Sequence, residues 1–557
     1  MRGHLARLRC GSTVVLLAIV ALAAALRLPH LASNPGWDGD EGYNYNIAFN
    51  LAHGHHQMFA LDFAYVQHPP LFFALAAGLF RLLGPSMLAL RLLSVAFCLG
   101  TLALLPALGR ALLRDEEPSL SRPQSAWFAL PTRVVPCGHC SPTPASGRGG
   151  AAAPPHGDPA HSRASLTRSG LLAALAYAVL PLVAVQNRFG YTYNGLAFWT
   201  VLALLALLRY RRDGRRGSLI LCGLAGAAAL CTDQEGVYLL PVLLLGLGGA
   251  SLVRRLGVVL LALCGPALYL GVLALIDRAA LVFDVAHTAG RVTGGSLVVQ
   301  MEMWLYNLAD LMRVDPAIPI GLAGLALLPH RSTRRLVLGL LAAMLLIILK
   351  VRDPNPLFRT AEPLLPLVCL GLGLVGATVW AGLDRIAGRI ERVREGSPWA
   401  KTFAALLIVL VVGAAAGDDV RAAATRIQTP IEGLLPRSTA AAQAMAGWLN
   451  ARLHSDDVVL AMPQVSWLLH ARTAELLQAV AITGRASAFY PAGIPRRRWV
   501  YDVHLAAARY LVVDTFTRIW ISQNSAERAL VRRAEHTWRL VYARGEYQVY
   551  ENPARAA

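Results

Sequence analysis

Three carboxylates, Asp38, Asp40 and Glu41, lie within four positions of the sequence WDGDEGYNYN. An ionised carboxylate can take the proton from an attacking hydroxyl group, and paired carboxylates can also bind a divalent cation such as Mg²⁺ or Mn²⁺. If Asp38 and Glu41 are both ionised, their charges raise the proton affinity of Asp40 and make it a better base. The alternative is structural: Asp38 and Asp40 form an Asx-type turn through Gly39 and cap a helix that begins near Gly42.

Further polar residues stand at the ends of apolar segments, where ionisable groups are costly and often mark a site. Arginine grips two phosphate oxygens with its planar fork, and a carboxylate can activate a hydroxyl group. Together they suit transfer from a lipid phosphate to an alcohol. Taken singly, each is better explained as an interfacial anchor or a helix cap. These residues are His68, Arg188, Tyr191, Tyr193, Asn194, Asp233, Glu235, Lys350, Arg352, Arg359 and Glu362.

The composition predicts a membrane protein, because 55% of the 557 residues are hydrophobic and 15% are charged, whereas soluble domains carry roughly 25% charged residues. Apolar runs near the ~20 residues that cross a bilayer recur along most of the chain. The sequence therefore predicts a mainly α-helical bundle of about eleven spans. They are expected near 13–28, 88–110, 169–185, 196–209, 217–231, 236–253, 256–276, 316–329, 336–350, 362–382 and 402–417.

The net charge of +19 gathers in alternate loops, which follows the positive-inside rule and argues against a nucleic-acid partner. Arginines in the first ten residues place the N-terminus in the cytoplasm, and we expect a multi-pass protein of the plasma (inner) membrane. The loop 29–87 with its carboxylates then faces outward, and its stretch 67–84 is expected to form an interfacial helix that Pro69 and Pro70 begin. A cleaved signal peptide in place of the first span would leave this loop outside as well.

Two segments differ from the transmembrane unit, which we assign to residues 1–417. Residues 115–168 are rich in Pro, Gly, Ser and Ala, and we expect a disordered cytoplasmic insert. Its CGHC sequence lacks the second ligand pair of a zinc site. Residues 418–557 have the composition of a small extracytoplasmic α/β domain without cysteine. Its strands are expected at 456–462, at 508–516 and, as a hairpin, at 540–551.

The sequence DGDEGYNYNIAFNLAHG, followed by QHPPLFFALAAGLFRLLGPSMLALRLLS, resembles the polytopic GT-C glycosyltransferases. The similarity is to the branch that contains protein O-mannosyltransferases and the aminoarabinose transferases of lipid A. The shared features are an Asp-Glu pair, a Tyr shortly after it, and an HPPL step before the RL that enters the next span. NRFGYTYNGLAFW (187–199) and FRTAEPLLPLVCLG (358–371) resemble later segments of the family.

This resemblance implies a sugar transfer with inversion, from a polyprenyl-phosphate donor to an extracytoplasmic glycan, lipid or protein. Asp40 matches the family's catalytic base, with Glu41 in a supporting role. Asp38 and Asp40 together would hold the divalent cation if one is needed, as in other GT-C enzymes.

The resemblance also implies where the donor and acceptor bind. His68 stands where some relatives carry a lysine that meets the donor phosphate, and because histidine is only partly charged at neutral pH, Arg359 and Arg188 are stronger candidates. Asn194 replaces an aspartate that relatives often carry, and Asp233 or Glu235 would compensate. The residues expected to bind substrate are Tyr43, Asn194, Asp233, Glu235 and Glu362.

A polytopic transporter or lipid flippase is the main alternative, since it would also combine many spans with buried charges. Such proteins tend to show an internal repeat and broken helices near the bilayer midplane, and the sequence displays neither. A scaffold role of the C-terminal domain is a third possibility. No phosphate-binding glycine motif is present, which argues against a nucleotide substrate.

Overall fold

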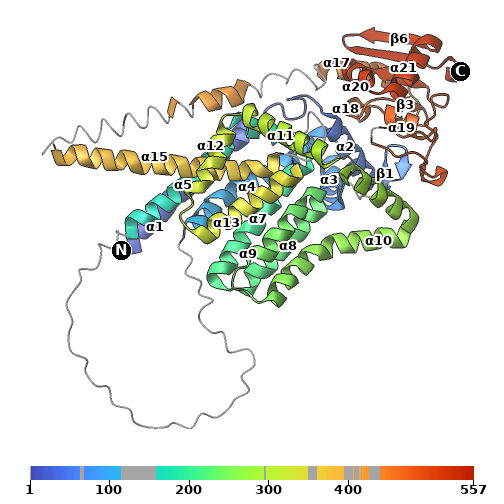
Figure 1. Ribbon diagram of the computed structural model, residues 1–557. Coiled ribbons are helices and arrows are strands. Elements are labelled where there is room, and N and C mark those ends of the chain that lie inside the picture. Colours follow the sequence, from blue (N-terminus) through green and yellow to red (C-terminus); the bar gives the residue numbers. More distant parts are fainter. Residues whose placement is uncertain are drawn as a thin grey trace, which may run out of the picture.

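The computed structural model describes residues 2–62, 68–114, 159–293, 296–348, 361–393, 406, 413–414, 417–425, 439–487 and 489–556, and these residues are mainly helical (Figure 1). A bundle of helices forms one part, and a five-stranded sheet near the C-terminus forms the other. The helices of the bundle are α1 (Arg2–Arg27), α4 (Met87–Leu113), α5 (Pro159–Val179), α6 (Pro181–Gln186), α7 (Thr192–Asp213), α8 (Arg216–Thr232), η2 (Gln234–Tyr238), α9 (Leu239–Gly246), α10 (Leu252–Thr293), α11 (Leu297–Val314), α12 (Ala317–Gly324), η3 (Leu325–Leu327), α13 (Arg331–Ile348), η4 (Glu362–Leu364) and α15 (Leu365–Val393).

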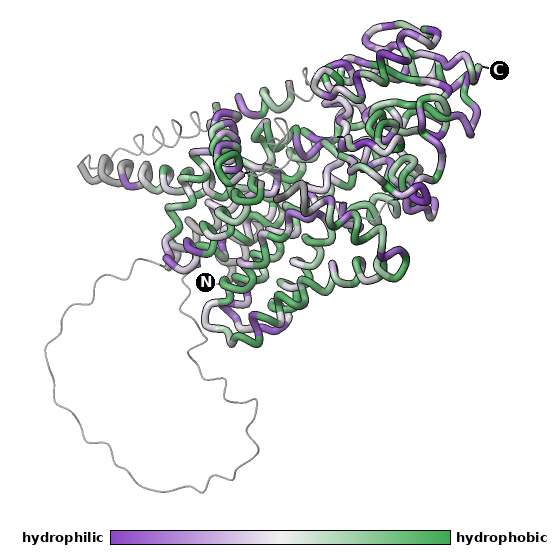
Figure 2. The backbone as a smooth tube through the Cα atoms, turned by 45° about the vertical axis from the view of Figure 1, so that its right-hand side comes forward, coloured by the Kyte–Doolittle hydropathy of each residue, from purple (hydrophilic) through white to green (hydrophobic). Residues whose placement is uncertain are grey.

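Four of the described helical stretches are long and apolar enough to cross a membrane: Met87–Leu113, Thr192–Asp213, Leu252–Thr288 and Glu362–Gly382. Shorter apolar helices accompany them, and Figure 2 shows hydrophobic residues throughout the bundle. The predicted span 402–417 lies almost entirely outside the described residues, so the count of eleven stays a prediction. The predicted span 169–185 is broken, because Pro181 begins a new helix after Leu180.

The bundle packs closely where small residues face each other. A Cβ atom on Gly371 of α15 would lie 1.7 Å from the carbonyl oxygen of Gly321 on α12, so the two backbones are in direct contact. Such contacts are typical of helices packed in membranes. By contrast, only 6% of the most apolar window of α10 is buried in the protein, and its helical geometry breaks at Asp277 (φ −148°, ψ 86°). The apolar part of α10 is therefore mostly exposed, as is expected of a helix that faces lipid.

The sheet has the strand order β4-β3-β5-β7-β6. β3 (Val458–Leu460) pairs in parallel with β4 (Arg472–Ala474) and β5 (Tyr510–Val513), while β7 (Tyr547–Glu551) is antiparallel to both β5 and β6 (Arg539–Arg544). The predicted strands at 456–462 and 508–516 and the predicted hairpin are confirmed, and β4 was not predicted. The helices of this region are α17 (Thr439–Asn450), α18 (Pro463–Ser466), α19 (Leu476–Ala481), η5 (Arg496–Arg498), α20 (Thr515–Gln523), α21 (Ser525–Thr537) and η6 (Pro553–Arg555).

The predicted outer loop does not stand apart from this sheet region. It contains α2 (Gly39–Ala52), the two-stranded β1 (Gln57–Met58) and β2 (Leu61–Asp62), and α3 (Pro70–Leu83). Pro70 begins α3, as predicted. One hydrophobic core combines side chains of this loop with side chains of the C-terminal strands. The loop and the sheet region therefore pack as one unit, although the sequence suggested two.

The predicted insert is shorter than expected at one end. Residues 115–158, which include CGHC, lie outside the described residues, whereas α5 begins at Pro159. The apolar residues that follow in α5 explain the helix, since it continues into the core of the bundle against α4 and α15.

Candidate functional site

Asp38 is the N-cap of α2. Its side chain accepts a hydrogen bond from the backbone N–H of Asp40 (3.1 Å), and Glu41 reaches back to the N–H of Asp38 (3.2 Å), which completes a capping box. The hydroxyl of Tyr191 also donates to Asp38 (2.8 Å). The capping interpretation is thus confirmed for Asp38, and the helix begins at Gly39 rather than near Gly42 because the cap lies at residue 38.

Glu41 forms an ion pair with Arg91 of α4, and both side chains are fully buried. The two nitrogens Nε and Nη2 of Arg91 donate to the two oxygens of Glu41, at 2.7 and 2.6 Å. The backbone N–H of Gly190 donates to the same carboxylate (2.7 Å). This arrangement corrects the expectation of three neighbouring negative charges, because Arg91 neutralises Glu41. Glu41 is a positioning residue that ties α2 to α4 and to the loop before α7.

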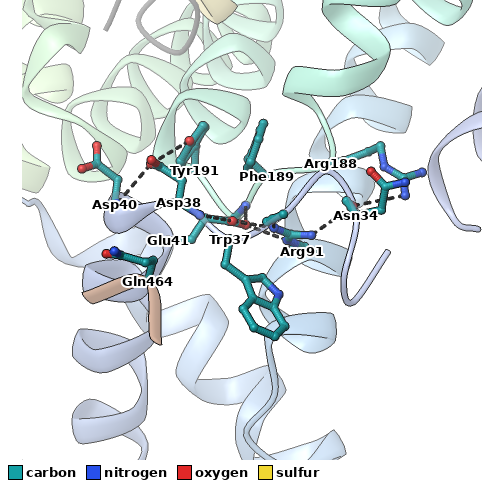
Figure 3. A network of polar contacts seen from close by, with 12 residues as sticks. Asn34, Trp37, Asp38, Asp40, Glu41, Arg91, Arg188, Phe189, Tyr191 and Gln464 are labelled. Carbon is teal, nitrogen blue, oxygen red and sulfur yellow. Dashed lines mark hydrogen bonds and ion pairs between the residues drawn. The ribbon is translucent and has the colours of Figure 1, made fainter. Parts of the chain in front are cut away.

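Asp40 lies between Asp38 and Glu41 in the first turn of α2 and is half-buried. Figure 3 shows its carboxylate on the side of the turn away from the ion pair of Glu41 and Arg91. Of the three carboxylates, Asp40 is therefore the one that neither caps the helix nor belongs to this ion pair.

Arg188 does not lie open to a phosphate group, contrary to its prediction as a donor-phosphate residue. It is fully buried, and its terminal nitrogens donate to the backbone carbonyls of Arg27 (2.9 Å), Pro29 (2.5 Å) and Asn34 (3.2 Å). Burial, together with the charges of Arg91 and Arg27, lowers its pKa to about 10, so that it stays charged at neutral pH. Arg188 therefore holds the turn that leads into the site.

A second buried network lies behind this loop and was not predicted as a unit. The side-chain oxygen of Asn187 accepts hydrogen bonds from Arg27 (3.1 and 3.0 Å), and its nitrogen donates to Glu362 (2.7 Å) and Asn194 (2.9 Å). Tyr177 also donates to Glu362 (2.9 Å). Glu362 and Asn194 were expected to bind substrate, but both are buried here as partners of Asn187. Because Arg188 follows Asn187 directly, this network anchors the same loop.

Asp233 and Glu235 stand at the junction of α8 and α9. Asp233 caps η2 by accepting from the N–H of Glu235 (3.0 Å), and it also accepts from the hydroxyl of Thr192 (2.6 Å), the residue after Tyr191. Both carboxylates are buried. Asp233 thus supports the loop that contacts Asp38, and compensation for the missing aspartate at position 194 stays a prediction.

Of the predicted donor-phosphate residues, the structure describes His68 and Arg188. His68 precedes α3 and places its ring against Phe73, with ring centroids 6.0 Å apart. Arg359 lies outside the described residues, as do Lys350 and Arg352.

Tyr43 lies one turn after Asp40 and donates a hydrogen bond to Glu475, which directly follows β4. Glu475 is fully buried. Burial raises the pKa of Glu475 to about 7, although hydrogen bonds from Tyr43 and Tyr490 lower it, and the charge of Glu527 raises it further. Tyr43, which was expected to bind substrate, thus joins α2 to the C-terminal sheet region. No local pattern in the sequence marks this contact.

We expect Glu475 to make stability depend on pH. Because its pKa is raised from 4.5 to about 7 on folding, the folded protein binds this proton more tightly than the unfolded chain. The free energy of unfolding should therefore fall as the pH rises from about 4.5 to 7, by about 3 kcal/mol in total. Glu475→Gln should remove this decrease while its amide oxygen still accepts from Tyr43. Thermal midpoints of both proteins at pH 4, 6 and 8 test this, and an equal pH dependence would contradict it.

No protein-family model and no curated protein matches this sequence, but solved structures do. ArnT from Cupriavidus metallidurans bound to undecaprenyl phosphate superposes with a TM-score of 0.60 at 14% identity, over 97% of this chain and 98% of that chain. The archaeal oligosaccharyltransferase AglB from Archaeoglobus fulgidus, in complex with an inhibitory peptide and a dolichol-phosphate, gives 0.53 at 13% identity, over 97% and 74%. The chain thus shares the fold of these two solved structures, which agrees with the fold that the resemblance to GT-C glycosyltransferases implied.

Proposed function

We propose that this chain is a membrane glycosyltransferase that uses a polyprenyl-phosphate sugar and glycosylates an extracytoplasmic hydroxyl acceptor with inversion. The observation that carries the proposal is the place of Asp40: it lies half-buried in the first turn of α2, between Asp38, which caps the helix, and Glu41, which pairs with Arg91. The fold supports it, since ArnT with the same fold is solved with undecaprenyl phosphate.

In the proposed reaction, the acceptor oxygen attacks the anomeric carbon of the sugar. Asp40 takes the proton of that hydroxyl, the bond between the anomeric carbon and the phosphate oxygen breaks, and the polyprenyl phosphate leaves with the electron pair. Attack from the face opposite to the leaving phosphate inverts the configuration. Asp38 and Glu41 contribute by holding the first turn of α2, which keeps Asp40 at a fixed distance from the acceptor.

The donor phosphate needs a positively charged side chain to bind it, and we propose Arg359 for this role. The terminal nitrogens of Arg188 donate to backbone carbonyls. Arg188 can therefore act on the phosphate only through its electric field and not by direct hydrogen bonds. Arg359 stands just before Glu362, whose position at the start of η4 is next to Asn187.

Arg359→Ala should weaken the use of donor more than Arg359→Lys, because lysine keeps the charge but loses the fork that grips two phosphate oxygens. The ratio kcat/KM for the donor should fall in the order wild type, Lys, Ala. Initial rates at limiting donor concentration measure this order. Equal rates for all three proteins would remove Arg359 from the site.

A divalent cation at Asp38 and Asp40 finds few further ligands in this structure. Within the part of the chain that is described, no group of three or more His, Cys, Asp or Glu side chains is placed to hold a metal ion. One oxygen of Asp38 already accepts from Tyr191 and from the N–H of Asp40. The two aspartates alone are a poor site for a cation that prefers six or more oxygen ligands.

We therefore expect transfer activity to persist after treatment with EDTA. The measurement compares the rate before treatment, after it, and after addition of excess Mg²⁺ or Mn²⁺. A loss with EDTA that either ion restores would instead support the cation site.

The function itself is tested with purified protein in lipid nanodiscs and a panel of undecaprenyl-phosphate sugars with radiolabelled mannose, glucose, arabinose or aminoarabinose. We expect release of undecaprenyl phosphate from at least one donor, and no reaction with the nucleotide-linked forms of these sugars. In proteoliposomes, movement of the intact donor across the bilayer without cleavage would support a flippase and overturn the proposal.

A further inference from the structure

The segments at the carboxyl ends of the parallel strands β3 and β4 contact α2. Gln464 follows β3, Glu475 follows β4 and Asp514 follows β5, and all three side chains are at least 98% buried. Ligand sites of α/β sheets lie at this edge. Here the edge contacts α2, through the hydrogen bond of Tyr43 to Glu475.

The segment that follows β3 touches the chain on both sides of Asp40, at Trp37 before α2 and at Gly42 within it. The rings of Trp37 and Trp467 meet edge to face, with centroids 4.9 Å apart. On the other side, a Cβ atom on Gly42 would lie 2.0 Å from the carbonyl oxygen of Pro463. Any side chain at position 42 would therefore push the two segments apart.

Gln464 lies between these two contacts. Its side-chain nitrogen donates to Asp514 (3.0 Å), and its backbone carbonyl accepts from the indole of Trp467 (3.0 Å). A Cβ atom on Gly39 would lie 4.0 Å from its side-chain oxygen, which places the amide against the residue before Asp40. Figure 3 shows Gln464 beneath Asp40.

We propose that Gln464 is a positioning residue of the site, and that residues 463–467 form the floor on which the turn with Asp40 rests. The inference depends on the proposed function in that it takes Asp40 as the base. Its consequence is that residues 463–467 take part in catalysis, because they set the distance between Asp40 and the acceptor hydroxyl. A displacement of about 1 Å can lower a rate by roughly 10²-fold.

Two variants disturb the floor. Gln464→Leu keeps nearly the same volume but loses the hydrogen bond to Asp514, and Gly42→Ala introduces the steric conflict with Pro463. Two matched controls make the same kinds of change elsewhere. Asn552→Leu removes another buried side-chain amide, which donates to the carbonyls of Ala506 and Ala508. Gly78→Ala alters a glycine of α3 with no neighbour within 4 Å.

The substrate is the undecaprenyl-phosphate sugar of the panel that the wild type cleaves. The turnover is expressed per donor-binding site, so that a smaller amount of folded protein does not lower the measured value. Both floor variants should lower this turnover by roughly tenfold or more with the dissociation constant of the donor within twofold. The controls should change neither. Unchanged turnover in Gln464→Leu would overturn the proposal.

A second measurement does not depend on catalysis. Hydrogen exchange in the full chain should become faster in the first turn of α2 in Gln464→Leu, and stay at the wild-type rate there in Asn552→Leu. If no donor is cleaved by the wild type, the proposed function fails, yet faster exchange would still show that Gln464 holds this turn. Unchanged exchange would show that it does not.

Discussion

Asp40→Asn should lower turnover by roughly 10²-fold or more while folding and donor binding remain close to wild type. Asparagine has nearly the shape of aspartate but cannot take a proton. The cap of α2 belongs to Asp38, so the helix should keep its start when residue 40 changes. Single-turnover rates with bound donor, together with the thermal midpoint and the dissociation constant of the donor, measure the three quantities separately.

Asp38→Asn is the matched control for this prediction. Asparagine at an N-cap still accepts from the backbone, and it can still accept from Tyr191, so we expect a smaller loss of turnover. If Asp40→Asn transferred sugar at nearly the wild-type rate, Asp40 would not be the base, and Asp38 and Asp233 would be the next residues to test.

Arg91→Met should destabilise the protein by about 3–5 kcal/mol, because it leaves the carboxylate of Glu41 buried without its partner. Adding Glu41→Gln in the same protein should restore part of this loss, since the uncompensated charge is then absent. Arg81→Met, at an exposed arginine that donates to the carbonyl of Ala52, should change stability by no more than about 0.5 kcal/mol. Denaturant unfolding in detergent measures all three, and a loss at Arg91 as small as that at Arg81 would contradict the prediction.

The features that the sequence predicted well rest on local signals. Apolar runs of bilayer length correspond to helices such as Met87–Leu113, and Pro70 marks the start of α3. The strand patterns near residues 458 and 510 are short apolar runs that became neighbouring parallel strands. In each case the residues that decide the structure lie within one element, so that their order along the chain is enough.

The roles of the polar residues could not be predicted in the same way, because their partners are distant along the chain. In the sequence, Glu41 predicted additional negative charge beside Asp40, whereas in the structure Arg91 forms an ion pair with it. Arg188 suggested a phosphate site, but backbone carbonyls surround it, and no sequence pattern marks which carbonyls point inward. Tyr43 donates a hydrogen bond to Glu475, and no sequence pattern near either residue predicts this contact.

The core shared by the outer loop and the C-terminal sheet region has a consequence for how the protein is made. Tyr43 and Glu475 are 432 positions apart, and at roughly 5–20 residues per second a ribosome needs roughly 20 to 90 s to synthesise the chain between them. During this time Trp37, Phe59 and Phe72, which are buried in the finished protein, lack the C-terminal residues of the core that they share. The outer loop cannot complete its core before the C-terminal sheet region has been synthesised. We therefore expect the packing of the outer loop against the sheet region to be among the last steps of biogenesis.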